Sequence, residues 1–382
     1  MAEEADPLPN FRMQDTAFDA TLDVDHADVL AARSSPRPYA IEFVSAAQLS
    51  GPMDALPTDP PHALSLTDRR ASEACLADAP ALSCVPSILV EATEELKSID
   101  GSASVLDFMA DRQRMSRGSL LVIVSGSIVQ DVDAFGARVH KREVPWILIP
   151  TTMLAQADNY IGSKGGTDRH RTKNLTGVFL APRRVVIDNG VLANLPPEHV
   201  PSVLGEVLRL SITGDPQLLD RFEELFPEAL DRDLRVLDQL IRMALSVKRA
   251  AGEVDEFEID LRRSMNFGGS IGHTVEAITG HAVPHGIAVT AGVLVEADIS
   301  NQRGSLSGEE RRRLPFAGSL VIPDSLRSLL ERVSLDEIRK LLIRDNEVER
   351  LTLNLVVREN FGQIRFVDVP FELVSLLLIE AA

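Results

Sequence analysis

The chain has 382 residues, of which 45% are hydrophobic, and a formal net charge of −18. A domain takes about 100–200 residues, so two domains are expected, each with enough apolar residues for a buried core. The acidic balance argues against a general nucleic-acid binder or a protein that adheres to anionic lipid, because both need basic surface. It does not exclude a small anionic substrate held in a local basic pocket.

The sequence carries no signal for export or membrane insertion. Its two cysteines, Cys75 and Cys84, cannot form a disulfide framework, which favours a reducing cytosol. No run of about 18 apolar residues is present, and the acidic N-terminus lacks the apolar segment of a signal peptide. We therefore expect a cytoplasmic protein.

The first hundred residues contain few regular patterns. Residues 1–37 are acidic, contain proline and show weak periodicity, which predicts an N-terminal extension. Residues 39–44 alternate like a strand, and the dense Pro and Asp of 51–62 indicate a loop. Apolar positions within 92–114 predict a helix.

A strand–helix–strand rhythm follows. Residues 119–124 form a short, continuous apolar run, typical of a strand buried on both faces of a parallel sheet. Residues 128–141 are patterned as a helix, and 144–150 and 184–188 are two further buried strands. This order predicts an α/β nucleotide-binding domain over residues 38–196.

The pattern changes near Pro196, and the rest of the chain is mostly helical in pattern. Helices are expected at 200–213, 217–251, 286–300, 324–332, 335–344 and 347–358. The sequence therefore predicts a second, all-α domain over residues 197–382, with the cleft between the two domains as the default site.

Two segments of the first domain have residues suited to phosphate binding. Small residues at Ser125-Gly126-Ser127, where a strand meets a helix, let backbone N–H groups approach a diphosphate. The Gly-rich stretch 161–166 and the following Lys173-Asn174 supply ammonium and amide donors. An ordinary turn and a flexible basic loop are the alternative interpretations.

The second domain has a constellation that resembles a metal or substrate site. Residues 262–276 combine Arg262, Asn266 and His273 with Gly-rich backbone, and His285 follows shortly after. Glu206 could join them as a carboxylate ligand, and Glu with His suits Zn²⁺ or a similar divalent ion. For any single histidine, a satisfied core or helix-cap residue is the commoner alternative.

Taken together, these segments resemble the sugar phosphate cyclase superfamily, whose best-known member is 3-dehydroquinate synthase. The resemblance runs from about residue 85 to 366, and its ordered motifs are IPTTMLAQAD, SKGGTD…KN, VVIDNGVLANLP, GEVLRL, LRRSMNFGGSIGHTVE and PHGIAV. It implies a Rossmann-like NAD-binding domain, a helical metal-binding domain and a homodimer.

The resemblance also implies a reaction. NAD⁺ oxidises a substrate hydroxyl and acidifies the neighbouring C–H, after which phosphate is eliminated. The ketone is then reduced again, and an aldol closure makes a six-membered carbocycle. A divalent ion such as Zn²⁺ or Co²⁺ holds the oxidised oxygen as a Lewis acid.

Position by position, the resemblance assigns roles to residues of this chain. It assigns NAD contacts to Asp68, Glu94, Lys97, Gly126, Ser127, Asp131, Thr151, Thr152, Asp158 and Lys173. It assigns the substrate phosphate to Lys164, Asn174, Asn266 and His273, with Arg142 reaching over from a dimer partner. Lys248 and Arg262 match the pair that binds the substrate carboxylate, which favours an acid substrate.

The metal site departs from the family pattern. The first metal histidine of the family falls on Gly269, which leaves Glu206 and His285 as metal ligands. Two ligands hold Zn²⁺ poorly, and His281 is the alternative third ligand. The lysine that follows the metal glutamate in the family is Arg209 here, which stays cationic but differs in volume and cannot give up a proton.

Two further positions depart as well. The family's three-glycine turn is Ser125-Gly126-Ser127, whose added Cβ atoms can crowd a cofactor diphosphate. The C-terminal Lys-Lys of the family is Val357-Arg358, so that one charge remains.

Three functions are consistent with these residues. The first is a divergent, NAD-dependent sugar phosphate cyclase acting on a phosphorylated keto-sugar acid or heptulose phosphate. The second is a catalytically silent homologue that binds a ligand or a partner, which Gly269 favours. The third is an NAD-dependent polyol-phosphate dehydrogenase, against which the KN loop and the NFG…GH motif argue.

Overall fold

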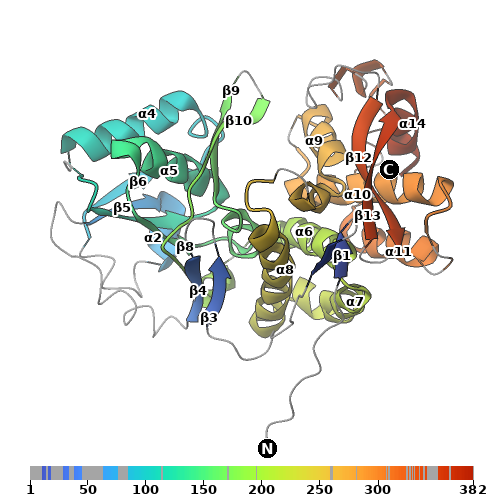
Figure 1. Ribbon diagram of the computed structural model, residues 1–382, viewed down its shortest axis with the longest axis horizontal. Helices are drawn as coiled ribbons and strands as arrows, with labels where there is room; N and C mark the ends of the chain where they lie inside the picture. The colour runs from blue at the N-terminus through green and yellow to red at the C-terminus, as the bar shows by residue number, and fades with distance from the viewer. Residues whose placement is uncertain are drawn as a thin grey trace, which may run out of the picture. The chain divides into compact units, whose positions relative to one another are not determined.

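The computed structural model describes residues 11–13, 16–18, 29–33, 38–44, 63–75, 85–112, 115–169, 172–194, 196–258, 261–280 and 282–306, most of 308–341, and 352–360 and 363–381. The chain divides into two compact units (Figure 1). One comprises residues 23–195, and the other comprises residues 1–22 together with 196–382.

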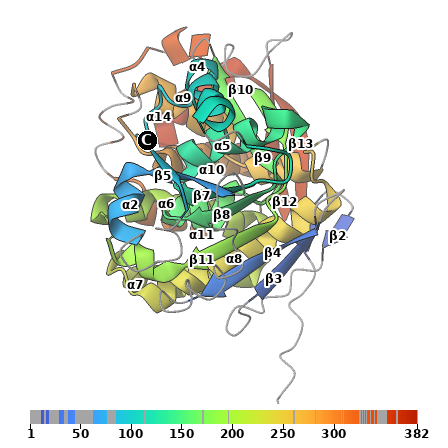
Figure 2. The same ribbon diagram turned by 90° about the vertical axis from the view of Figure 1, so that its left-hand side faces the viewer.

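The unit of residues 23–195 is built on a seven-stranded sheet. Its strands, in spatial order, are β3 (Val29–Arg33), β4 (Pro38–Val44), β11 (Arg184–Asp188), β8 (Trp146–Pro150), β7 (Leu120–Ser125), β5 (Ala63–Asp68) and β6 (Ser87–Val90) (Figure 2). All neighbours are parallel except β3 with β4. The parallel sheet and the strands expected at 39–44, 119–124, 144–150 and 184–188 are confirmed.

Helices and a strand pair complete this unit. The helical segments are α2 (Arg69–Cys75), α4 (Ile99–Asp107), η2 (Phe108–Arg112), α5 (Ser127–Val139), η3 (His140–Arg142), η4 (Ala155–Asn159) and η5 (Asn189–Asn194). The antiparallel pair β9 (Lys164–Arg169) and β10 (Thr172–Phe179) packs against α5, which also packs on β7 and β8. Every residue of β7 is buried because helices cover the sheet, which explains its continuous apolar run.

The other unit is mostly helical. Its helices are η6 (Pro197–His199), α6 (Val200–Thr213), α7 (Pro216–Leu230), α8 (Leu234–Val254), η7 (Leu261–Asn266), α9 (Gly269–Ile278), α10 (His285–Gln302), α11 (Glu310–Val321) and α14 (Phe371–Ala381). Its strands form two hairpins, β1 (Phe11–Met13) with β2 (Thr16–Phe18) and β12 (Thr352–Asn360) with β13 (Gln363–Pro370). α10 is central and packs against α6, α9, α11 and α14.

Some expected elements differ from the structure. The helix expected at 347–358 is wrong, because the described part of that segment is β12, paired antiparallel with β13. The helix expected at 217–251 is two helices, α7 and α8, separated by a turn in which Arg232 has a φ of 61°. β3 lies within the segment expected to be an extension, and the loop expected at 51–62 lies outside the described residues.

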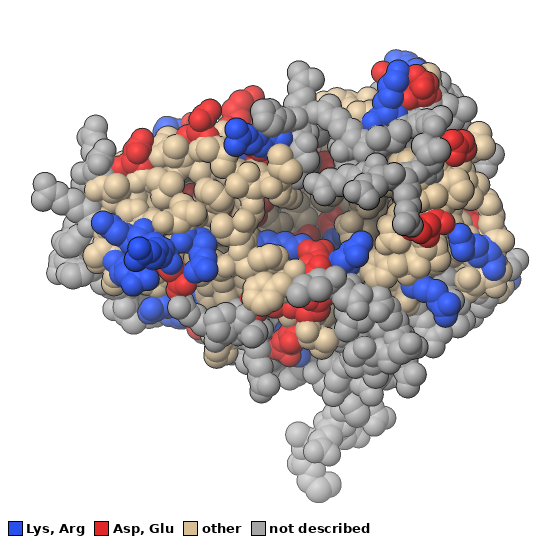
Figure 3. Space-filling model, turned by 45° about the horizontal axis from the view of Figure 1, so that its top comes forward, with Lys and Arg blue, Asp and Glu red and all other residues tan. Residues whose placement is uncertain are grey.

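In the described part of the chain, no helix has both the length and the apolar character needed to span a membrane. On the face drawn in Figure 3, acidic and basic side chains are interspersed with uncharged ones.

Candidate functional site

Two glycines let α6 and α10 approach closely and so bring Glu206 next to His285. A Cβ on Gly205 would overlap the carbonyl oxygen of Gly286, and a Cβ on Gly286 would overlap that of Ser202. The Gly286 N–H donates to Ser202 Oγ at 3.0 Å, which fixes the start of α10 against α6. The motifs GEVLRL and PHGIAV therefore lie at one helix–helix contact, with the side chains of Glu206 and His285 at its edge.

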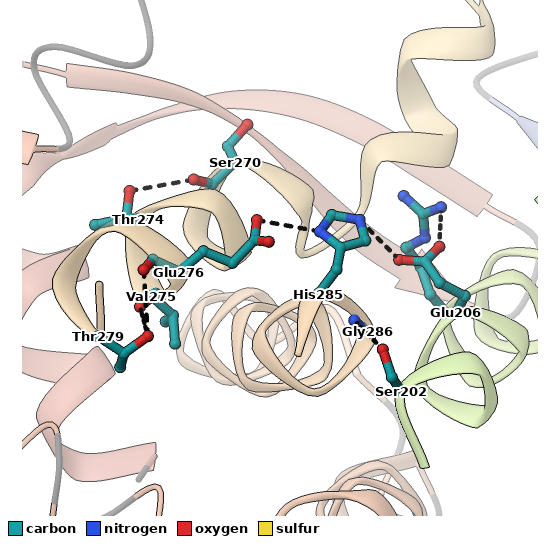
Figure 4. Close-up of polar contacts among 10 residues, drawn as sticks. Ser202, Glu206, Ser270, Thr274, Val275, Glu276, Thr279, His285 and Gly286 are labelled. Carbon is teal, nitrogen blue, oxygen red and sulfur yellow. Dashed lines mark hydrogen bonds and ion pairs between the residues drawn. The ribbon is translucent and has the colours of Figure 1, made fainter. Parts of the chain in front are cut away.

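His285 lies between two carboxylates (Figure 4). Its Nε2 is 3.3 Å from Oε1 of Glu206, and its Nδ1 is 3.1 Å from Oε2 of Glu276. The guanidinium of Arg209 pairs with Oε2 of Glu206 one turn along α6. The ring of His273 stacks on that of His285, with centroids 5.6 Å apart and an interplanar angle of 27°.

The charges of this group hold one another ionised. Burial opposes ionisation of Glu206, but Arg209 and His285 outweigh it and lower the pKa of Glu206 to about 2. Burial likewise opposes a charge on His285, but hydrogen bonds to Glu206 and Glu276 raise its pKa to about 9. In the absence of a bound ion, the group is a chain of alternating charges: guanidinium, carboxylate, imidazolium and carboxylate.

The loop before α9 is shaped by glycine. Gly268 has a φ of 75°, a conformation that other residues rarely adopt, and its N–H donates to Oε2 of the buried Glu296 at 2.8 Å. A Cβ on Gly269 would overlap Oδ1 of Asn266. A side chain at position 269 therefore requires Asn266 to move.

The ligand pair implied by the resemblance does not fit a metal ion well. Gly269 offers no ligand atom, and one oxygen of Glu206 is engaged by the guanidinium of Arg209. Within the described residues, the group that offers three ligand atoms within 4.8 Å of one another is His273, Glu276 and His285.

Glu276 and Glu296 were not among the residues expected at the site. Glu276 could have been found from its spacing, because residues three apart on a helix share a face and His273 is three residues earlier in α9. Glu296 lies 11 residues after His285, about three turns along α10, and the sequence offers no further signal for it.

Lys248 and Arg262 form a second charged feature of this unit. Lys248 lies on α8 and Arg262 on η7, and both are predicted to bind a substrate carboxylate. Burial, and then the nearby Arg262 charge, lower the pKa of Lys248 to about 7. Arg262 is anchored by a hydrogen bond from its guanidinium to the carbonyl of Glu256 at 2.7 Å. A partly buried cation near a buried one is suited to an anionic ligand.

In the unit of residues 23–195, the turn from β7 into α5 suits a diphosphate. Gly126 is the N-cap of α5, and no side chain caps the helix there. A Cβ on Gly126 would lie 2.9 Å from Cγ2 of Thr152, so the backbone approaches its neighbours as closely as glycine permits. The exposed N-terminal amides of a helix attract an anion, and the site therefore fits the NAD implied by the resemblance.

Lys97 and Asp131 pair near this turn. Their Nζ and Oδ2 atoms are 2.7 Å apart, and Asp131 outweighs the effect of burial to raise the pKa of Lys97. Lys164 and Asp168 contribute to the same electrostatic environment. Oδ1 of Asp168 accepts from the Asn174 N–H at 2.7 Å and holds the KN loop, a role not expected from the sequence.

The remaining expected residues lie at element ends or turns of the same unit. Asp68 ends β5, Ser127 begins α5, Thr151 follows β8, Asp158 lies in η4, Glu94 lies in the turn before α4, and Arg142 ends η3 with a φ of 70°. His281 and the side chains of Lys173 and Arg358 lie outside the described part of the chain.

Known proteins match most of the chain. Family models for the N-terminal and C-terminal parts of 3-dehydroquinate synthase match residues 87–202 and 203–348. The 3-dehydroquinate synthase of Geobacter metallireducens is 32% identical over 271 residues, which cover 70% of this chain and 74% of that protein. The 2-epi-valiolone synthase of Actinosynnema mirum is 31% identical over 296 residues, 76% of this chain and 73% of that protein.

The fold is also shared with solved structures. A crystal structure of 2-deoxy-scyllo-inosose synthase complexed with carbaglucose-6-phosphate, NAD⁺ and Co²⁺ has a TM-score of 0.80 at 19% identity. The match covers 92% of this chain and 99% of that one. At this identity the match shows a common fold.

Proposed function

The chain belongs to the sugar phosphate cyclase superfamily, and we propose that it converts a phosphorylated keto-sugar acid or heptulose phosphate into a carbocycle. The observation that carries the proposal is the pair of the partly buried Lys248 and the buried Arg262, in the same unit as the Glu206–His285 group. Two fixed cations suit a carboxylated substrate, which favours an acid over a neutral sugar phosphate.

The first unit would hold the cofactor. The N-terminus of α5, with Gly126 and Ser127, would bind the diphosphate of NAD through backbone N–H groups. When bound there, NAD would supply a hydride acceptor and donor within one turnover, so that the reaction has no net oxidation. The other NAD contacts are those expected from the resemblance: Asp68, Glu94, Lys97, Asp131, Thr151, Thr152, Asp158 and Lys173.

The substrate would be bound by its two anionic ends. Lys248 and Arg262 bind the carboxylate, and the phosphate is assigned to Lys164, Asn174, Asn266 and His273. Arg142 of the partner subunit would complete the phosphate site in a homodimer. These groups fix the substrate so that an oxygen of the phosphate itself takes the proton from the acidified carbon as the phosphate leaves.

Arg209 and His285 complete the polar site. The guanidinium keeps Glu206 ionised, and the ring of His285 lies between Glu206 and Glu276. The fixed positive charge of Arg209 can stabilise negative charge that develops on a substrate oxygen. No step of this scheme requires an ion at Glu206.

The test is release of inorganic phosphate from a heptulose phosphate and from a phosphorylated keto-sugar acid, with NAD added. We expect phosphate release from the acid substrate without accumulation of NADH. Lys248→Met is expected to raise KM for the acid about tenfold or more and to change KM little for the neutral substrate, because it removes a cation that the neutral substrate does not use. Absence of phosphate release from both substrates would contradict the proposal.

A catalytically silent homologue is the second candidate, and Gly269 is the observation that favours it. It predicts that the protein binds a phosphorylated acid by calorimetry and releases no phosphate. Accumulation of one NADH per substrate consumed would instead identify a dehydrogenase.

A further inference from the structure

The two nitrogens of His285 face different environments. On the Nε2 side is Glu206, which is fully buried and paired with the guanidinium of Arg209. On the Nδ1 side is Glu276, 3.1 Å away, with the ring of His273 stacked nearby. An ion on the Nε2 side would have to share Glu206 with the permanent cation of Arg209, which already pairs with Oε2 of Glu206.

The Nδ1 side also has the better ligand set. His273, Glu276 and His285 each offer one ligand atom, and these atoms lie within 4.8 Å of one another. Two imidazoles and one carboxylate form a common ligand set of catalytic zinc, which leaves a fourth position open. His273 and Glu276 project from successive turns of α9, and His285 is the first residue of α10, so the positions of the ligands are fixed by two packed helices.

We propose that a divalent metal ion of the Zn²⁺ or Co²⁺ class binds on the Nδ1 side of His285, held by His273, Glu276 and His285. In this site Glu206 is not a ligand. It accepts the Nε2–H of His285 and orients the ring, while Arg209 keeps Glu206 charged. A carboxylate that orients a ligand histidine in this way is a general feature of metal sites.

The proposal explains how the chain tolerates Gly269. In place of the ligand missing at position 269, Glu276 and His273 each offer a ligand atom beside His285. Glu276 thereby takes the ligand role that the resemblance gives to Glu206, and Glu206 orients His285. This assignment makes His273 a metal ligand in place of the phosphate contact that the resemblance implies. The use of the bound ion in catalysis rests on the proposed function.

The test compares two matched substitutions of buried glutamates. The full-length protein is stripped with a chelator and titrated with Co²⁺, and binding is followed by the visible absorption of the ion and by elemental analysis. We expect one ion per chain in the wild type. Glu276→Gln is expected to abolish binding at micromolar Co²⁺, whereas Glu206→Gln weakens it by about 10–100-fold, as for an orienting residue.

Two further measurements keep the result independent of misfolding. Glu296→Gln removes another buried glutamate, the one that accepts from the Gly268 N–H, and is expected to leave the stoichiometry unchanged. X-ray absorption of the wild-type Zn²⁺ protein is expected to show two imidazole ligands, and His273→Ala is expected to reduce them to one.

The proposal is overturned by any of three results: no bound ion in the wild type, a larger loss of affinity in Glu206→Gln than in Glu276→Gln, or two imidazoles retained in His273→Ala. None of these readouts involves substrate or NAD. Failure to release phosphate would therefore contradict the proposed function and leave the metal site standing, and the reverse also holds.

Discussion

Lys248 is a partly buried cation near the buried Arg262, and this pairing is expected to make anion binding depend on pH. Burial and the Arg262 charge both favour the neutral amine, and they lower the pKa of Lys248 to about 7. The charge of Lys248 is therefore present below pH 7 and is lost as the pH rises above it. A bound carboxylate raises the pKa of Lys248 again, because it stabilises the ammonium form.

This sign leads to a prediction about ligand affinity. Between pH 7 and 9, where a phosphate monoester is already a dianion, we expect the affinity for a phosphorylated carboxylic acid to fall by up to about tenfold per pH unit. Calorimetric titration at several pH values measures the effect. Lys248→Met is the control, and its binding is expected to be weak and nearly flat with pH. An equal slope in both proteins would contradict the assignment.

Gly269 and Arg209 are two departures from the family pattern, one to a smaller and one to a larger residue, that can depend on each other. The family resemblance places a metal histidine at position 269, where a Cβ would now overlap Asn266. Arg209 pairs with Glu206, which no longer needs an ion for its charge. Both changes favour the same outcome, in which the charge of Glu206 is paired with the guanidinium of Arg209.

At the scale of elements, the long apolar pattern of 217–251 is interrupted because helix ends are set by capping residues. The side chain of Asp215 caps α7 and accepts from the Gln217 N–H at 2.9 Å, and Asp233 caps α8. Between them, Arg232 adopts a positive φ that ends α7. The apolar periodicity continues across the turn, and for this reason the sequence pattern of 217–251 predicts one helix.

The cap of α7 can be tested by substitution. Asp215→Ala is expected to lower the free energy of unfolding by about 1 kcal/mol, because the Gln217 N–H loses its acceptor. Asp215→Asn keeps the acceptor and is expected to restore most of the stability. Burial raises the pKa of Asp215. Denaturant unfolding measures both variants, and equal destabilisation in both would contradict this explanation.

The β12–β13 hairpin is the element that the local sequence pattern predicted least well. Leu353, Leu355 and Val357 are buried, but Val356 between the last two is buried as well, so the alternation typical of a strand is blurred. The hairpin is instead stabilised by antiparallel pairing over eight residue pairs and by packing of β12 against α10. A local pattern cannot report a contact with a helix about 50 residues earlier in the chain.

At the scale of the whole molecule, ligand binding is expected to stabilise the protein through the unit it occupies. NAD at about 100 times its dissociation constant raises the free energy of unfolding of its unit by about 2.7 kcal/mol. Because the chain has two compact units, the shift belongs to the calorimetric transition that includes residues 23–195.

A glycine substitution makes this prediction specific. Gly126→Val adds a side chain where a Cβ already lies 2.9 Å from Thr152, and it is expected to abolish the thermal shift caused by NAD. Gly118→Ala is the control, because the nearest atom to its Cβ is 3.9 Å away, and the shift is expected to remain. An undiminished shift in Gly126→Val would place NAD elsewhere.

The net charge of −18 can also be interpreted at the scale of the whole molecule. Arg209 and Arg262 are buried cations and Lys248 is a partly buried one in an otherwise acidic chain, and acidic side chains are spread over the face in Figure 3. The negative total therefore coexists with local positive sites, as a small anionic ligand requires.

The sequence by itself determined the parallel sheet, the turn at Gly126 and the helical character of the second unit. These features follow from local patterns, because a buried parallel strand needs a continuous apolar run and a close backbone approach needs glycine. Its motifs also indicated Glu206, Arg209 and His285 as members of one site, but not Glu276.

Only the tertiary structure decided how those side chains combine. The close packing of α6 on α10 placed Glu206 on one nitrogen of His285, and the packing of α9 on α10 placed Glu276 on the other. Which carboxylate faces which nitrogen depends on how α10 packs against α6, which is distant in sequence, and against α9, which directly precedes it. No spacing in the chain contains that information, and the proposed metal site depends on it.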